Sequence, residues 1–198
     1  MSQVIIVDSG GANLASLQFA LQRLDARAIV TSDPAVIHSA ARVILPGVGA
    51  ARDAMGRLHA SGLDEVIPQL KQPVLGICLG MQLLFERSEE GESACLGVIP
   101  GAVKRMQAEA GRPIPHMGWN ELKSRRNDPL LEDIADGSYV YFVHSYAAPL
   151  SDATLATAEY GEDLPALVRR NNFWGAQFHP ERSGAVGARV LANFLRIH

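Results

Sequence analysis

Residues 73–85 read PVLGICLGMQLLF and place a single cysteine between two apolar runs. The first run, VLGI at 74–77, is short and bounded by a proline, which predicts a buried strand. The second run, LGMQLLFE at 79–86, predicts a helix. In an open α/β sheet, ligands bind outside the carboxyl ends of the strands. The stretch therefore predicts a strand-to-helix turn that presents the thiol of Cys78 at a ligand-binding edge.

The alternation of strand and helix extends toward the N-terminus. Strands are predicted at 3–8, 27–31 and 42–46, helices at 13–24, after Pro34 and at 63–70, and a loop at 47–53. Near-continuous hydrophobic strands with helices between them indicate a parallel sheet that helices cover on both faces.

The second half of the chain has a different character. Strands are predicted at 98–106, 139–147, 153–160, 166–171 and 173–179, with short turns and little helix between them. They predict antiparallel hairpins added to the parallel sheet. An apolar stripe along 184–198 predicts a final helix. Because no Pro/Gly/Ser-rich linker occurs, we expect one α/β domain of mixed sheet over residues 1–198.

The composition is that of an ordinary globular protein and excludes several classes of function. Of the 198 residues, 47% are hydrophobic and 20% are charged, so disorder is not expected. A net charge of −3 leaves no basic face for nucleic acid. The two cysteines lie among apolar residues, which favours a reducing compartment over a disulfide framework. Without a signal-peptide pattern or a run of about 20 apolar residues, we expect a soluble, cytoplasmic protein.

The residues around Cys78 follow the logic of a nucleophile elbow. Gly76 and Gly80 flank the cysteine at the positions where a tight turn has no room for a side chain. The turn would place the sulfur at a helix N-terminus, which favours a thiolate, with the backbone N–H of Leu79 directed at a developing oxyanion. The strand and helix alone fit a buried, inert cysteine equally well. Cys95 lacks the flanking glycines and is expected to be structural.

The segment FHPE at 178–181 supplies a candidate base. His179 and Glu181 are two residues apart, so on an extended segment their side chains lie on the same side. Pro180 disfavours a helical conformation for the residue before it. Glu181 could then accept a hydrogen bond from one imidazole nitrogen while the other faces the sulfur. A solvated surface turn is the alternative interpretation of the same four residues.

GICLGMQ and, a hundred residues later, QFHPE together resemble the class I, triad-type glutamine amidotransferases. The resemblance implies a flavodoxin-like, three-layer α/β fold with a mostly parallel central sheet. It also implies Cys78 as the nucleophile, His179 as general base and acid, and Glu181 as the residue that orients His179. Neither a cofactor nor a metal ion is implied.

The resemblance extends to the loop PGVGA at 46–50 and to the substrate site. It implies an oxyanion hole made by the backbone N–H groups of Val48 and Leu79. Glycines on both sides of Val48 would allow a peptide of this loop to flip. The remaining substrate-binding positions that the resemblance implies are Gly47, Gly49, Gln82, Ser145 and Tyr146.

The segment PIPHMGWNEL at 113–122 follows neither strand nor helix periodicity. Met and Trp are enriched at interfaces, although Trp119 could instead fill the core. With DSGGANL at 8–14 and HPERS at 179–183, the segment is similar to the glutaminase subunits of imidazole glycerol phosphate synthases. Partner-contact positions implied by this similarity are Asn13, Met117, Trp119 and Arg182.

That similarity implies hydrolysis of L-glutamine to L-glutamate and ammonia through a cysteine thioester. The chain has no room for a synthase domain, so a separate cyclase subunit, resembling a (β/α)8 barrel, would receive the ammonia. In these enzymes the cyclase forms imidazole glycerol phosphate and AICAR in histidine biosynthesis. The chain departs from the usual pattern at Ser9, Ala12 and Arg182, which are expected near the partner face.

Other interpretations predict different residues. The glutaminases of anthranilate and GMP synthases carry a Pro-Gly-Pro-Gly loop and that of pyridoxal phosphate synthase a Gly-Gly-Glu-Ser loop, whereas this chain has Pro-Gly-Val-Gly. A redox-sensing protein with a cysteine elbow would not need the FHPE segment. A scaffold that has lost catalysis would not need the intact set of Cys78, His179 and Glu181.

Overall fold

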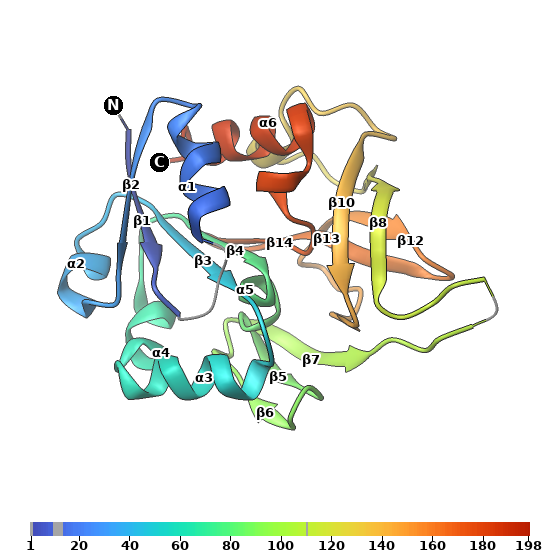
Figure 1. The fold of residues 1–198 in the computed structure, drawn as a ribbon, viewed down its shortest axis with the longest axis horizontal. Coiled ribbons are helices and arrows are strands. Elements are labelled where there is room, and N and C mark those ends of the chain that lie inside the picture. Colours follow the sequence, from blue (N-terminus) through green and yellow to red (C-terminus); the bar gives the residue numbers. More distant parts are fainter. Residues whose placement is uncertain (1, 10–13, 110) are drawn as a thin grey trace.

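The computed structural model describes residues 2–9, 14–109 and 111–198, and its centre is an eight-stranded sheet (Figure 1). The first five strands in the order are parallel to their neighbours, and the last three add antiparallel pairs at one edge. In spatial order the strands are β2 (Ala26–Thr31), β1 (Ser2–Val7), β3 (Val43–Gly47), β4 (Val74–Cys78), β14 (Phe173–Ala176), β13 (Asp163–Arg170), β12 (Thr154–Glu159) and β9 (Lys123–Ser124).

Helices cover both faces of this sheet, as Figure 1 shows. Alternate residues of β1 belong to different cores: Val4 packs with one hydrophobic cluster and Ile5 with the other. The Val4 cluster includes residues of α1 (Leu14–Gln22) and α6 (Gly184–Phe194). The Ile5 cluster includes residues of α2 (Pro34–His38), α3 (Ala51–Ala60) and α4 (Leu63–Val66), which is followed by a 3-10 turn, Ile67–Gln69. The result is a three-layer α/β arrangement, as predicted.

Two smaller sheets lie beside the main one. One pairs β10 (Tyr139–His144) with β8 (His116–Glu121) in antiparallel register. The other has the order β11 (Tyr146–Ala147), β7 (Ile99–Arg105), β5 (Phe85–Ser88) and β6 (Ser93–Ala94). A further 3-10 turn, Pro129–Leu131, precedes β10. None of the described helices is long and apolar enough to cross a membrane.

The predicted N-terminal strands and the antiparallel additions are confirmed, but several local predictions were wrong. The chain from 51 to 60 is helical, although a loop was expected to reach residue 53, and the expected helix at 63–70 is one short turn followed by a 3-10 turn. The buried face of α3 is made by Ala51, Ala54 and Leu58. Two of these three side chains are single methyl groups, so the helix carries a weak apolar signal.

The helix that follows Cys78 is also shorter than predicted, because α5 (Leu79–Gln82) ends after one turn. The chain then enters β5, where Phe85 lies opposite Ile99 of β7. The segment 113–122, for which no periodicity was predicted, contains the strand β8. Pairing with β10 therefore decides the conformation of β8.

Candidate active site

Cys78 lies at a strained turn between β4 and α5. Its backbone has φ 53° and ψ −110°, a conformation that residues with a Cβ rarely adopt. The next residue begins α5, so the cysteine projects from the carboxyl end of a central parallel strand. The structure thus contains the sharp strand-to-helix turn that the flanking glycines predict.

Three glycines allow this turn because the backbone segments around it touch. A Cβ on Gly80 would lie 1.8 Å from the carbonyl oxygen of Leu45, and one on Gly76 would lie 2.6 Å from that of Gly80. A Cβ on Gly47 would lie 2.8 Å from the backbone nitrogen of Gly80. The ends of β3 and β4 and the start of α5 therefore pack backbone against backbone.

Cys78 opens into a cavity of about 440 Å³, a size suited to a small metabolite. Four segments contribute most of the wall: the loop 46–49, residues 77–82, residues 143–146 and residues 179–182. Leu17, Glu90 and Pro115 complete it. No group of three metal-ligating side chains that could hold an ion occurs in the part of the chain that the structure describes.

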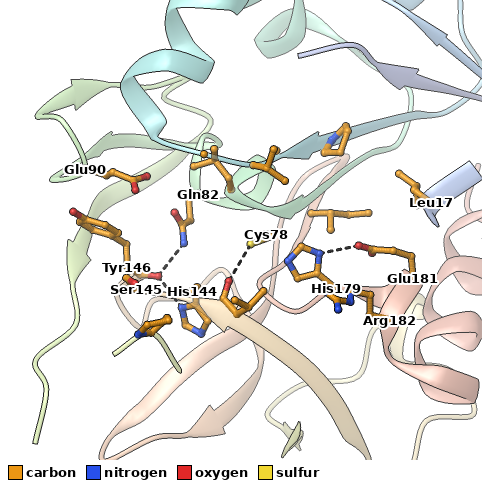
Figure 2. Close-up of a pocket in the computed structure, with 18 residues that line it drawn as sticks. Leu17, Cys78, Gln82, Glu90, His144, Ser145, Tyr146, His179, Glu181 and Arg182 are labelled. Atoms are coloured by element: carbon orange, nitrogen blue, oxygen red, sulfur yellow. Dashed lines mark hydrogen bonds and ion pairs between the residues drawn. The ribbon is translucent and has the colours of Figure 1, made fainter. Parts of the chain in front are cut away.

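The three residues proposed as a triad are brought together at one end of this cavity (Figure 2). His179 Nδ1 lies 2.8 Å from Glu181 Oε1. Because a carboxylate only accepts, Nδ1 carries the hydrogen and Nε2 is left for the cysteine. The thiol of Cys78 meanwhile points at the carbonyl oxygen of Val143, 3.8 Å away. The second carboxylate oxygen of Glu181 is buried with no hydrogen-bond partner among the described residues.

The electrostatic surroundings of His179 favour its protonated form. Burial by itself lowers the pKa of His179, but its contacts with Cys78 and Glu181 outweigh burial and raise the pKa to about 10. The site therefore retains a proton on the imidazole beside the sulfur. A general acid needs such a proton when an amine leaves.

The geometry that joins His179 to Glu181 differs from the predicted one. The predicted strand ends at Ala176, and Pro180–Arg182 form a 3-10 turn. His179 alone is extended, with φ −97° and ψ 98°. The turn, and not strand alternation, brings the carboxylate back to the ring.

Two buried glutamines connect the sulfur to the opposite wall of the cavity. The amide nitrogen of Gln82 donates to the carbonyl oxygen of Tyr146 at 2.9 Å and to Gln177 Oε1 at 3.0 Å. The amide nitrogen of Gln177 lies 3.9 Å from Cys78 Sγ. Both N–H groups of Gln82 are thus used within the protein, while its predicted substrate contact stays a prediction. Gln177 was missed, although it directly precedes the FHPE segment.

Sequence reasoning also missed Glu90. This residue lines the cavity and lies beyond Gln82 as seen from Cys78 in Figure 2. Its Oε2 atom accepts a hydrogen bond from the backbone of Ala51 at 2.9 Å. Burial raises the pKa of the Glu90 carboxyl. Only a polar turn after β5 surrounds it in sequence, so no pattern distinguished it from a surface glutamate.

The loop that was predicted to complete the oxyanion hole lines the same cavity as Cys78, and its residue Gly47 pairs with Cys78 across β3 and β4. Gly49 has φ 83°, a conformation that favours glycine. Ser9 donates from Oγ to the carbonyl oxygen of Pro46 at 3.1 Å and is 2% exposed. The side chain of Ser9 is therefore buried beneath this loop, and its expected place near the partner face stays a prediction. Ala12 and Asn13 lie outside the described residues.

Three of the predicted partner-contact residues lie near one another on the outer side of β8 and β10. Met117 is 65% exposed and Trp119 is 55% exposed, so Trp119 does not fill the core. The Trp119 ring packs edge-on against Tyr141, with centroids 6.0 Å apart. The guanidinium of Arg182 lies 4.9 Å from the centre of the same Tyr141 ring. These residues form an exposed face next to the triad.

The comparison with known protein families covers nearly the whole chain. Residues 5–197 match the family described as glutamine amidotransferase class-I. The chain belongs to this family. Solved structures share the fold. The match to a crystal structure of a glutamine amidotransferase covers 97% of this chain and 96% of that chain, with 20% sequence identity and a TM-score of 0.74. The match to the structure of PurLQS from Thermotoga maritima covers 98% of this chain and 97% of that chain, with 22% sequence identity and a TM-score of 0.69.

Curated relatives narrow the similarity within the class-I amidotransferases. Imidazole glycerol phosphate synthase subunit HisH of Xylella fastidiosa is 50% identical over 197 residues, covering 100% of this chain and 98% of that protein. The subunit of the same name from Xanthomonas euvesicatoria pv. vesicatoria is 51% identical with the same coverage. The resemblance that PHMGWN carries is thereby confirmed.

Two further histidines form a buried pair at the cavity wall, which His144 lines. His116 Nδ1 and His144 Nε2 are 3.0 Å apart, and both side chains are buried. Burial lowers the pKa of each histidine to about 4. Unlike His179, these two have no carboxylate partner and stay neutral.

Substitution by alanine should change the free energy of unfolding in opposite directions at Gly80, in the turn after Cys78, and at Gly56, within α3. Gly80→Ala forces a Cβ against a backbone carbonyl and should lower the free energy of unfolding by about 3 kcal/mol or more. Gly56→Ala, exposed within α3 with nothing near its Cβ position, should raise it by about 0.5–1 kcal/mol. Urea titration measures both. Equal effects of the two variants would contradict the close packing at the elbow.

The neutral histidine pair should make the folded state sensitive to acid. An unfolded histidine binds a proton near pH 6.5, whereas His116 and His144 bind one only near pH 4 when folded. The unfolded state therefore holds more protons between these values, and stability falls as the pH falls through that window. The pKa of His179 is raised instead of lowered, so the stability that His179 contributes is lost only above pH 6.5, as the pH rises toward about 10.

The check is the urea midpoint at pH 7.0 and pH 5.5 for the unsubstituted chain and for His116→Asn. We expect a smaller loss of midpoint on acidification in the variant, because one of the two groups is removed. Identical losses would show that the pair does not titrate as described.

Proposed function

We propose that this chain is the glutaminase subunit of an imidazole glycerol phosphate synthase and hydrolyses L-glutamine to L-glutamate and ammonia. The observation that carries the proposal is the meeting of Cys78, His179 and Glu181 in a small-molecule cavity. The substrate and pathway come from the full-length similarity to proteins named as that subunit. We further propose that residues 1–198 act as one amidotransferase domain.

The proposed reaction uses the triad in two steps. His179 already holds the proton beside the sulfur, so Cys78 Sγ attacks the side-chain carbonyl carbon of glutamine as the thiolate of an ion pair. The oxyanion is stabilised by the backbone N–H groups of Val48 and Leu79. His179 then gives the proton to the leaving nitrogen, so that ammonia departs and a thioester remains. Water adds to the thioester with His179 as base, glutamate leaves, and His179 again holds the proton beside the sulfur.

The far end of the cavity would hold the amino-acid end of glutamine. We assign the backbone of Ser145 and Tyr146 to the α-carboxylate end, as the resemblance implies. We assign Glu90 to the α-ammonium group, because it is a carboxylate that lines the cavity beyond Gln82. Gly47 and Gly49 give the oxyanion loop its freedom to change conformation.

Ammonia released into water at neutral pH becomes ammonium, which is not a nucleophile, so the product has to pass directly to a second active site. We propose that a (β/α)8-barrel cyclase subunit covers the exposed face of Met117, Trp119 and Arg182, with Asn13 at its margin. The cyclase would form imidazole glycerol phosphate and AICAR in the cytoplasm. Stacking on Tyr141 suits the planar guanidinium of Arg182, which a lysine would not reproduce.

Loss of the nucleophile should separate the two half-reactions. Cys78→Ala in the complex with the cyclase should abolish glutamine-dependent formation of imidazole glycerol phosphate and leave the ammonia-dependent rate unchanged. Cys95→Ala is the control, since burial raises the pKa of that thiol to about 11 and it lies outside the cavity. Glutamine-dependent synthesis that survives Cys78→Ala would refute the proposed function.

Removal of the charge at Glu90 should affect binding more than chemistry. Glu90→Gln should raise KM for glutamine about tenfold, which corresponds to loss of one charge-assisted hydrogen bond. The value of kcat should change little, because Glu90 is remote from the triad in Figure 2. Glu89→Gln, at the preceding residue but outside the cavity, is the matched control. An unchanged KM in Glu90→Gln would remove the glutamate from the substrate site.

A further inference from the structure

Hydrogen bonds link β8 to the wall of the substrate cavity through the two buried histidines. The amide nitrogen of Asn120 lies 3.2 Å from His116 Nε2, and His116 Nδ1 lies 3.0 Å from His144 Nε2. His144 Nδ1 lies 2.8 Å from the carbonyl oxygen of Tyr146, a residue of the cavity wall. The chain of contacts ends at the backbone of Tyr146, which we assigned to binding the amino-acid end of glutamine.

Only one placement of hydrogens satisfies this chain when both rings are neutral. A carbonyl oxygen can only accept, so His144 Nδ1 carries a hydrogen and Nε2 is bare. His116 Nδ1 must then donate to that bare nitrogen, which leaves His116 Nε2 to accept from Asn120. Because every bond has a fixed direction, the two rings cannot rotate or exchange tautomers independently.

Packing holds the first ring of the pair in place. His116 lies between two aromatic rings, with centroids 4.1 Å from Tyr160 and 4.8 Å from Phe142, and both rings are nearly parallel to it. The hydroxyl of Tyr160 donates to the carbonyl oxygen of Pro113 at 2.7 Å. His116 is 4% exposed and His144 is 6% exposed. Neither ring has the freedom of a surface histidine.

The carbonyl at the end of the chain is fully occupied. It accepts from His144 and also from the amide nitrogen of Gln82, which uses both lone pairs of the oxygen. The same Gln82 amide contacts Gln177, whose own amide nitrogen approaches Cys78 Sγ. A shift of His144 would therefore displace the Tyr146 peptide and Gln82 together.

We propose that the His116–His144 pair is a positioning device that fixes the Tyr146 peptide and Gln82 for glutamine binding. This inference rests on the proposed function, because it requires glutamine in the cavity. The pair does not relay protons, since its last acceptor is a peptide carbonyl that cannot take up a proton and pass it on. It also does more than fill space, because two apolar side chains would leave the Tyr146 carbonyl without its second donor.

The test compares two substitutions of His116 in the complex with the cyclase. In His116→Asn, an amide N–H can replace Nδ1 as the donor to His144, whereas His116→Leu removes the donor. We expect His116→Leu to raise KM for glutamine about fivefold or more, in line with loss of a buried hydrogen bond. We expect kcat to change by less than about threefold and His116→Asn to stay within about twofold of the unsubstituted KM.

Co-purification of each variant with the cyclase reports on folding and docking and should not change, and an unchanged ammonia-dependent rate shows that the cyclase itself is active. If His116→Leu does not assemble, Asn120→Leu takes its place, because it removes the first donor from a partly exposed position and should raise KM about threefold. Equal KM values in the Leu variant tested and in the unsubstituted complex would overturn the inference, as would equal impairment by His116→Asn and His116→Leu. Absence of glutamine turnover in the unsubstituted complex would instead overturn the proposed function and this inference with it.

Discussion

The contact between the backbone of Gly80 and the carbonyl of Leu45 fixes the relation between two neighbouring strands at their carboxyl ends. Because of this contact, α5 starts directly against the end of β3, and the turn at Cys78 has to be sharp. The same contact places the loop 46–49 beside Cys78 at the cavity. The cavity, the nucleophile and the candidate oxyanion donors thus share one geometric origin, which a hydrogen in place of a side chain makes possible.

Burial lowers the pKa of all three histidines near this cavity, but the net shift differs between them. In His179 the contacts with a thiol and a carboxylate outweigh desolvation, and the pKa rises. In His116 and His144 no carboxylate compensates, and the pKa falls. Partners rather than depth therefore decide which imidazole carries a charge. One histidine is prepared for proton transfer, and the other two act as neutral, directional hydrogen-bonding groups.

The parts of the fold that sequence predicted best are those in which local pattern and tertiary packing agree. β4 is a continuous apolar run, and glycines at 76 and 80 mark the turn that follows it. β8 shows why other strands were not predicted from the sequence. Its alternation is inverted, since His116 and Asn120 face inward while Met117 and Trp119 face outward. A pattern search that expects apolar residues inside finds no strand there.

The active site was predictable only where its residues share a short motif. Cys78, His179 and Glu181 belong to two such motifs, so the structure brings together what the sequence suggested. Glu90 comes from a polar turn of a different sheet and Gln177 acts through a contact across 99 positions, and neither gives a local signal. Such residues are recognisable only once the sheets are placed in space.

The hydrogen bond from Ser9 to Pro46 ties the segment after β1 to the loop beside the nucleophile. These two segments are 37 positions apart in the chain, yet neither can be treated as a separate module. A chimera that imports an N-terminal segment without a serine at this position would remove the hydroxyl that donates to that carbonyl. Exchange of such parts between relatives should therefore transfer both segments as one unit.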